Sequence, residues 1–106
     1  MPVDVEGQCF AWANRNSVGD DVVVHAWVTD RDNAARGGQL NYWHAWIERD
    51  GKVLDWQSEV ADIRRRGTTV AAFRRKYKPT RERHYKHLDT LKHMLRSGHH
   101  GPWHAL

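Results

Sequence analysis

The stretch from Tyr42 to Gln57 constrains the fold of this chain more than any other. Two runs rich in Trp, Ile, Val and Leu flank Asp50-Gly51, and this dipeptide accommodates the two positive φ angles of a two-residue type I′ turn. The pattern therefore predicts a β-hairpin. Because a two-residue loop fixes the register, Arg49 is expected to lie opposite Lys52.

This register places a histidine and a carboxylate on one face of the hairpin. Trp46 is expected to lie opposite Asp55, and because side chains alternate along a strand, His44 shares their face. His44 and Asp55 are then diagonal neighbours, roughly 5–8 Å apart at the backbone, a distance that two short polar side chains can bridge. An imidazole held by a carboxylate forms the base and the orienting group of a catalytic triad. The opposite face is expected to hold Ala45, Ile47, Leu54 and Trp56.

The only cysteine, Cys9, is the candidate nucleophile. Gly7 before it and helix-tolerant residues after it predict a short helix from about Cys9 to Asn16, with Cys9 in the first turn. There the helix dipole and a nearby histidine favour the thiolate, which is the nucleophilic form. A single cysteine cannot form an internal disulfide, so the thiol is left for chemistry. The resulting hypothesis is a triad of Cys9, His44 and Asp55.

The order of these residues resembles a known superfamily. A Cys on a helix, then the run His44–Glu48 on a strand, then Gly51 and Asp55, is similar to the transglutaminase-like branch of the papain-like cysteine hydrolases. The run around His44 is especially similar to the leader peptidases that process lasso peptides. The resemblance covers about half of the chain, from Gly7 to Asp55.

The resemblance implies a role for each residue. Cys9 would attack an acyl carbon, His44 would carry the proton, and Asp55 would orient the His44 ring. Papain-like enzymes also place a Gln before the Cys as an oxyanion donor, and Gln8 is the candidate here, together with the backbone N–H of Cys9. The chain departs from the family because the helix predicted after Cys9 is short. No cofactor is needed for this chemistry.

A structural role competes with each of these assignments. Most free cysteines are small buried hydrophobes. Asp55 also fits a surface carboxylate, and Gln57, directly opposite His44, is a rival partner for the ring. The tripeptide His-Ala-Trp occurs twice, and His25 of the first copy is expected either to line the same cleft or to be a core histidine. Glu48 is interpreted as a charge at the rim.

The rest of the chain predicts a single α+β domain over residues 1–106. Val22–Thr29 has the β-branched and aromatic residues of a strand, with apolar residues on both faces, so we expect it to be central. Asp30–Gly38 reads as a flexible hairpin-type connection. Arg81–Tyr85 fits either an edge strand or the start of a helix. The expected fold is a minimal papain-like or transglutaminase-like core, with an N-terminal helix carrying the Cys, three or four antiparallel strands, and C-terminal helices.

Helix signals dominate the second half. Ser58–Gly67 has a Ser cap, Arg in the last turn and a Gly stop, and Thr69 caps a second helix over Val70–Tyr77. A third helix is expected from about His87 to Ser97, closed by Gly98, with Leu88, Leu91 and Leu95 as its apolar stripe. Trp103 is expected to dock on the body of the domain.

The charge is divided unevenly between the halves. Residues 1–57 carry five Lys/Arg against nine Asp/Glu, whereas residues 58–106 carry twelve against four. The basic half is expected to be a mainly helical extension, and its charge predicts an anionic partner. The partner is either an acidic protein or a nucleic acid, whose bases would stack on the aromatic rings between the basic residues. The simpler alternative is that these residues form a solvated helix face. The candidate partner-binding residues are Arg64, Arg65, Arg66, Arg74, Arg75 and Lys76.

Two classes of function are thereby predicted. The first is a small cysteine-dependent acyl-transfer enzyme, a peptidase, amidase or deamidase with a peptide or protein substrate. The alternative is a non-enzymatic binding module, or a degenerate member of the fold. The eight histidines show no zinc spacing, so no metal is expected. No apolar run reaches about 18 residues and the start is polar, which predicts a cytoplasmic protein without a membrane span.

Overall fold

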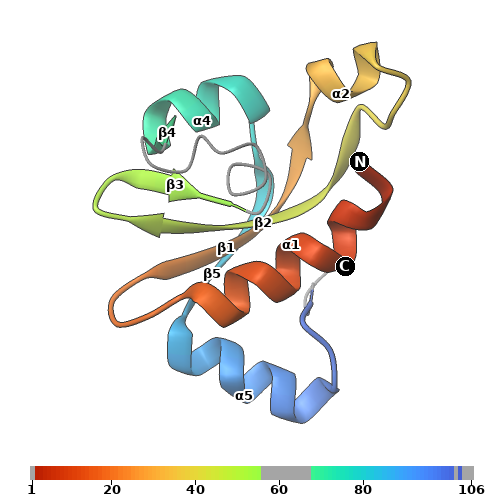
Figure 1. Cartoon of the computed structure of the whole chain (residues 1–106). Coiled ribbons are helices and arrows are strands. Elements are labelled where there is room, and N and C mark those ends of the chain that lie inside the picture. The colour runs from red at the N-terminus through yellow and green to blue at the C-terminus, as the bar shows by residue number, and fades with distance from the viewer. Residues whose placement is uncertain (1, 56–67, 102, 104–106) are drawn as a thin grey trace.

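An antiparallel sheet organises the computed structural model, which describes residues 2–55, 68–101 and 103, with the backbone alone for residues 2–8. Within the described residues the sheet has five strands in the order β4-β3-β2-β1-β5 (Figure 1). The strands are β1 Val22–Thr29, β2 Asn41–Arg49, β3 Lys52–Leu54, β4 Thr68–Thr69 and β5 Thr80–Lys86. The predicted α+β class is confirmed, with one more short strand, β4, than expected.

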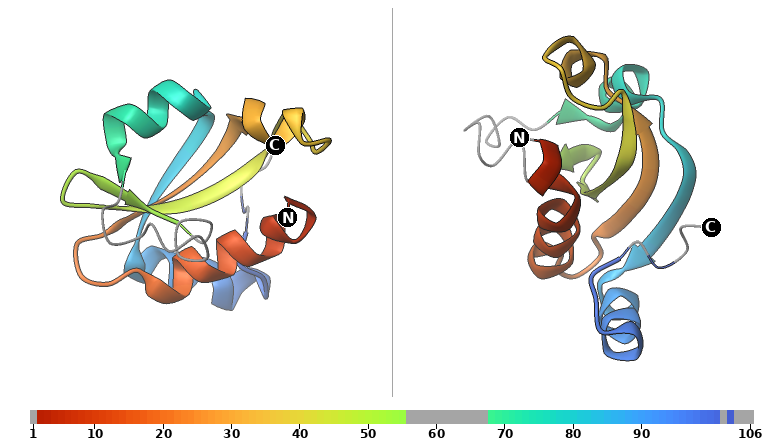
Figure 2. Two further views of the ribbon diagram at one scale, coloured as in Figure 1. Left: turned by 45° about the horizontal axis from the view of Figure 1, so that its top comes forward. Right: turned by 90° about the vertical axis from the view of Figure 1, so that its right-hand side faces the viewer.

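Helices cover both faces of this sheet. The described helices are α1 Pro2–Asn16, α2 Arg31–Ala35, α4 Val70–Tyr77 and α5 His87–Ser97. The sheet lies between α4 and α1 (Figure 2, left). The core on the α1 face contains Cys9, Phe10, Ala13, Val23, Ala45, Ile47 and Tyr85. The core on the α4 face contains Val24, Ala26, Val28, Tyr42, Trp46, Val53 and Phe73.

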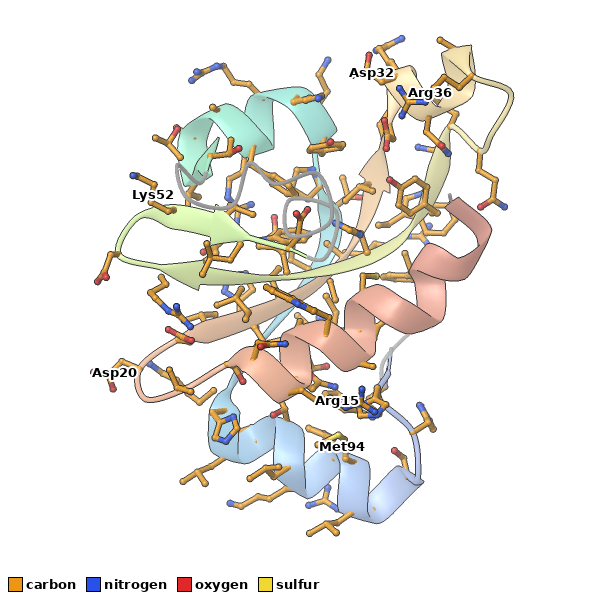
Figure 3. The ribbon with its side chains drawn as sticks, in the orientation of Figure 1. Arg15, Asp20, Asp32, Arg36, Lys52 and Met94 are labelled. Carbon is orange, nitrogen blue, oxygen red and sulfur yellow. The ribbon has the colours of Figure 1, made fainter. Side chains whose placement is uncertain are left out.

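The β2–β3 hairpin has the predicted register. Arg49 pairs with Lys52 and Ile47 with Leu54. Asp50 and Gly51 have φ angles of 52° and 78°, which are the two positive values that a type I′ turn requires. Figure 3 shows Lys52 at the tip of the hairpin, away from the cores. The turn chemistry therefore sets which residues of β2 and β3 share a face.

Strand β1 is central, as predicted. It pairs with β2 on one side and with β5 on the other, so its side chains are buried against both helical layers. Arg81–Tyr85 thus adopts the strand alternative, as part of the edge strand β5. The connection predicted over Asp30–Gly38 is more ordered than expected, because Asp30 caps the short helix α2 by accepting the N–H of Asn33 at 3.0 Å.

The predicted start of the first helix is wrong, since α1 begins at Pro2 and not near Cys9. The later helices follow the prediction. The Thr69 hydroxyl accepts the N–H of Ala72 at the start of α4, and Gly98, with φ of 79°, ends α5. The helix predicted over residues 58–67 lies outside the described residues, as do Trp56 and Gln57.

The leucine stripe of α5 does not face the core as expected. Leu88, Leu91 and Leu95 are 68%, 38% and 88% exposed, whereas Thr90, on another side of the helix, is fully buried. Trp103 packs on the body, as predicted, with its ring centroid 5.0 Å from those of His25 and Tyr85.

A partly buried ion pair joins the turn before β1 to the end of β2. Arg49 donates from Nε to Asp21 Oδ1 at 2.9 Å and from Nη2 to Oδ2 at 2.8 Å. The backbone N–H of Val18 also donates to Asp21. The bonds from Arg49, against the opposing effect of burial, hold the pKa of Asp21 below its usual value. Asp21 thus closes the connection between α1 and β1.

Replacing this carboxylate tests the role of the ion pair. We expect Asp21→Asn to lower the free energy of unfolding by about 1–2 kcal/mol at neutral pH, a moderate loss because Arg49 is partly exposed. Since the folded pKa of Asp21 is depressed, its contribution is present above the unfolded pKa of about 3.9 and is lost as the pH falls through the folded value. Urea denaturation at neutral and acidic pH measures both effects.

The neighbouring exposed residue provides the matched control. Asp20 lies on the same turn and is exposed (Figure 3), so Asp20→Asn is expected to leave the unfolding midpoint nearly unchanged. Equal effects of the two substitutions would contradict the role given to Asp21.

Candidate active site

His44 lies on β2 with its ring on the α4 face of the sheet. The side chain is 1% exposed. The rings of Tyr42 and Trp46 lie 5.9 Å from it, centroid to centroid, and Phe73 of α4 stacks nearly parallel to it at 6.4 Å. A polar ring enclosed in this way needs polar partners of its own, because burial removes its contacts with water.

Asp55 supplies one of these partners. It directly follows β3, is 5% exposed, and its Oδ2 lies 3.2 Å from His44 Nε2. The predicted diagonal contact across the hairpin is therefore present. The rival partner Gln57 lies outside the described residues.

Cys9 is the second polar group associated with the His44 ring. Its side chain is completely buried, and it is the second group, after Asp55, that raises the pKa of the His44 ring. Nδ1 of His44 makes no hydrogen bond of regular geometry among the described residues. Hydrogen bonds between catalytic groups are often long or poorly aligned before a substrate binds.

The fold explains how residues from different layers meet. Cys9 belongs to the core on the α1 face, whereas the His44 ring lies among residues of the α4 face. Strand β3 ends opposite Ile47, so among the described residues no strand pairs with β2 on that side from Asn41 to Trp46. A side chain of α1 can approach the ring along this part of β2, where no described strand pairs with it.

The environment of His44 favours its protonated form. Burial alone lowers the pKa of the ring, but the hydrogen bonds to Asp55 and Cys9 and the charges of both groups raise it, and together they bring the pKa of His44 to about 10. The ring thus lies between two groups that can carry negative charge. This arrangement stabilises the imidazolium form of His44.

The position of Cys9 within α1 bears on two expectations. Because α1 begins at Pro2, Cys9 does not lie in the first turn, where the dipole acts most strongly. A backbone N–H inside a helix ordinarily donates to the carbonyl four residues earlier, so the oxyanion role of the Cys9 N–H stays a prediction. The side chain of Gln8 lies outside the described part of the chain, so its role stays a prediction.

All three triad residues are closed off from solvent. Cys9, His44 and Asp55 are 0%, 1% and 5% exposed. A substrate can therefore reach the sulfur only when part of the covering structure moves. This degree of closure distinguishes the site from an open cleft.

His25 has a different environment although it belongs to the same tripeptide. It is 1% exposed and lies among the rings of Phe10, Tyr85 and Trp103, at 4.7–5.0 Å. Neither ring nitrogen has a hydrogen-bond partner among the described residues. Burial, and secondarily the charge of His93, lowers the pKa of His25 to about 3. Of the two alternatives, His25 is the core histidine.

The predicted partner-binding residues are only partly described. Arg64, Arg65 and Arg66 lie outside the described residues. Arg74 forms ion pairs with Glu48 and Glu82, and Lys76 pairs with Asp32 at 3.2 Å. Arg75 is exposed. The charges of α4 are therefore largely balanced within the domain, and Glu48 is half-buried and paired, not a free rim charge.

Sequence reasoning missed the ring that stacks on the proposed base. Phe73 lies on the buried side of α4, and its contact with His44 joins α4 to β2 across the fold. Periodicity shows which face of a helix is apolar, not which strand it will meet. No local signal in the sequence identifies this pair.

Two further classes of site are not supported by the described part of the chain. Residues 2–55, 68–101 and 103 contain no cluster of three or more His, Cys, Asp or Glu side chains suited to a metal ion. None of the helices described is long and apolar enough to cross a membrane. Comparison with known proteins gave no match to any family model, curated protein or solved structure.

The unpartnered ring of His25 predicts a pH effect on stability. Its folded pKa of about 3 lies below the unfolded value of about 6.5, so its stabilising contribution is complete above pH 6.5 and is lost as the pH falls from there towards 3. We expect His25→Leu to remove about 2 kcal/mol of the loss in stability between pH 7 and pH 4.5. Urea denaturation at the two pH values measures this difference.

An exposed histidine serves as the control. His84 is exposed and pairs with Glu82 at 2.8 Å, so His84→Gln is not expected to reduce the acid sensitivity of the fold. If His25→Leu and the wild type lost stability in parallel on acidification, the buried, neutral state of His25 would be refuted.

Proposed function

We propose that this protein is a small cysteine-dependent acyl-transfer enzyme that cleaves an amide bond in a peptide or protein. The observation that carries the proposal is the position of the His44 ring, held by Asp55 at 3.2 Å on one side and acted on by the Cys9 thiol. The resemblance to papain-like hydrolases between Gly7 and Asp55 supports the same assignment. Peptidase, amidase and deamidase share this chemistry.

The geometry supports distinct roles for the three side chains. Asp55 fixes the orientation of the ring through Nε2 and stabilises its positive charge. This leaves the other nitrogen, Nδ1, to exchange a proton with the sulfur. Because water is excluded from the three groups, their electrostatic interactions are stronger than at a surface.

The reaction follows from these roles. The Cys9 sulfur, its proton transferred to His44, attacks the acyl carbon and forms a C–S bond, giving a tetrahedral oxyanion. The C–N bond then breaks, and His44 gives its proton to the leaving nitrogen. Water attacks the resulting thioester while His44 takes one of its protons, and the C–S bond breaks to release the carboxylic acid. The last proton returns from His44 to the sulfur, so the cycle consumes only the amide and water.

One observation favours a second candidate function. The complete burial of Cys9 is also what a packing cysteine shows, and a domain of this kind would act only by binding a partner. The two candidate functions differ in one measurable property. In the enzyme the reactivity of the Cys9 thiol depends on His44, whereas in the binding module it does not.

Alkylation with iodoacetamide, followed by intact mass spectrometry under native conditions, tests the proposal. We expect His44→Gln to slow alkylation of Cys9 at neutral pH by about tenfold or more, because the proton acceptor is lost. Asp55→Asn is expected to give a smaller decrease, because the ring is retained without its orienting charge. Since all variants keep the thiol at the same buried position, their ratio separates activation from access.

The matched control is His84→Gln, which removes an exposed histidine and is expected to leave the rate unchanged. Circular dichroism and thermal unfolding identify any variant that has lost its fold, in which case His44→Asn provides a second substitution. An alkylation rate that is the same in the wild type and in folded His44 variants would refute the enzyme and favour the binding module.

The pH dependence of the same reaction gives an independent prediction. Because the pKa of His44 is raised to about 10, the ring keeps its proton well above pH 6.5, and the proposed charged pair of this imidazolium with the Cys9 sulfur is expected to persist across neutral pH. The wild-type rate should therefore vary little between about pH 6 and pH 8, whereas an ordinary thiol reacts about tenfold more slowly for each unit below its pKa. A steep wild-type profile, parallel to that of His44→Gln, would contradict the charged pair.

A further inference from the structure

Helix α5 exposes an apolar stripe at one end of the molecule. Leu88, Leu91 and Leu95 are spaced i, i+3 and i+7 and so lie on one face of the helix, and they are 68%, 38% and 88% exposed. The helix lies beyond α1 and follows directly on β5 (Figures 1 and 2). Exposed leucines that form a contiguous stripe are typical of an interaction surface.

The orientation of α5 is fixed by other residues, so this exposure is a property of the fold. Thr90 is fully buried, and the His93 ring stacks on Trp103 at 4.7 Å. Met94 lies on the side of α5 that faces α1 (Figure 3). At the start of the helix, the His87 ring hydrogen-bonds the Ser17 hydroxyl at 2.9 Å. These contacts anchor one side of α5 and leave the leucines on another.

Cations border the stripe and are available for a partner. Lys92 and Arg96 each follow a leucine of the stripe by one residue, and Lys86 precedes the helix. All three are exposed, and none forms an ion pair with a described residue. This differs from α4, where Arg74 and Lys76 are paired with carboxylates of the domain. Positive charges that are not paired within the described residues therefore lie along the border of the leucine stripe.

We propose that Lys86, Leu88, Leu91, Lys92, Leu95 and Arg96, called here the α5 surface, bind an acidic amphipathic segment of another protein. The apolar side of such a segment covers the three leucines, and its carboxylates pair with the three cations. Apolar anchors at helical spacing within a charged rim are the usual elements of helix-mediated recognition. The inference does not depend on the proposed catalysis.

Charge and area favour this occupant over a second copy of the chain. Three leucines on one short helix fall far short of the roughly 800 Å² that each partner buries in a stable interface. A two-fold antiparallel pairing of α5 with itself would also bring Lys92 close to its own copy, which is repulsive. An acidic partner turns the same charges into attractive ones.

Nucleic acid and lipid match the α5 surface less well than an acidic protein segment does. Phosphates and bases gain little from three leucines, and the rings expected to stack on bases are not exposed, since Phe73 and Tyr85 are buried and Tyr77 is half-buried. An anionic bilayer would place negative charge against Asp89 as well as against the cations, because Asp89 is exposed in the first turn beside Leu88. An acidic protein segment, in contrast, can have a neutral or basic residue opposite Asp89.

A designed peptide provides the test. The probe is a fluorescein-labelled helical peptide with leucines on one face and glutamates on the other, titrated with the full chain and followed by anisotropy. We expect binding in the micromolar range that weakens as salt is added. The paired variants Leu91→Ser with Leu95→Ser, and Lys92→Glu with Arg96→Glu, are each expected to weaken binding by about tenfold or more.

Matched controls distinguish binding at the α5 surface from non-specific binding. Leu40→Ser removes a leucine that is 43% exposed elsewhere, and Arg75→Glu reverses an exposed charge on α4; both are expected to leave binding unchanged. Lys92→Glu with Arg96→Glu should instead bind a probe in which lysines replace the glutamates. Cys9→Ala should bind like the wild type, so failure of the enzyme and failure of the surface are distinguishable.

Four results would overturn the proposal. They are absence of probe binding, equal loss in the control variants, tighter binding to phosphatidylserine vesicles or to an oligonucleotide than to the probe, and self-association abolished by Leu91→Ser with Leu95→Ser. Because the substituted leucine, lysine and arginine side chains are exposed, thermal unfolding is expected to show that these variants keep their fold. The same measurement checks Cys9→Ala, whose side chain is buried.

Discussion

The hydrogen bond between His44 and Asp55 depends on one constraint, the register of the β2–β3 hairpin. Asp50 and Gly51 both adopt positive φ angles, and the two-residue turn then aligns the strands so that His44 and Asp55 meet at 3.2 Å. A shift of one residue in either strand would turn these side chains to opposite faces. The chemistry proposed for the site therefore depends on a turn at the far end of the hairpin.

The two His-Ala-Trp copies show that surroundings, not residue identity, decide the state of a buried histidine. His44 and His25 are equally buried, but a carboxylate and a thiol raise the pKa of the first, whereas aromatic rings around the second leave burial to lower it. The imidazolium is thus stabilised on the α4 face and the neutral ring on the α1 face. Among the described residues, only the copy in register with Asp55 has a carboxylate beside its ring, so only His44 is held in its protonated form near neutral pH.

Local signals predicted most of this fold, whereas long-range packing had to be observed. The turn at Asp50-Gly51, the Thr69 cap and the Gly98 stop each act within a few residues, and each element they define was correctly predicted. The start of α1 and the exposure of the α5 leucines depend on what packs against those helices, which no window of sequence contains. The same applies to the site, where the His44–Asp55 pair follows from register but the approach of Cys9 crosses more than thirty residues.

The strand order keeps the two proposed activities apart. The triad is built on β2 and β3, whereas α5 follows β5 at the opposite edge of the sheet, with β1 between β2 and β5. Helix α1 is the element common to both, since it carries Cys9 and also, through Ser17 just beyond its end, bonds His87 at the start of α5. A partner on the outward side of α5 would therefore not lie against β2 or β3. The position at which the sulfur is approached is separate from the position at which a partner is held.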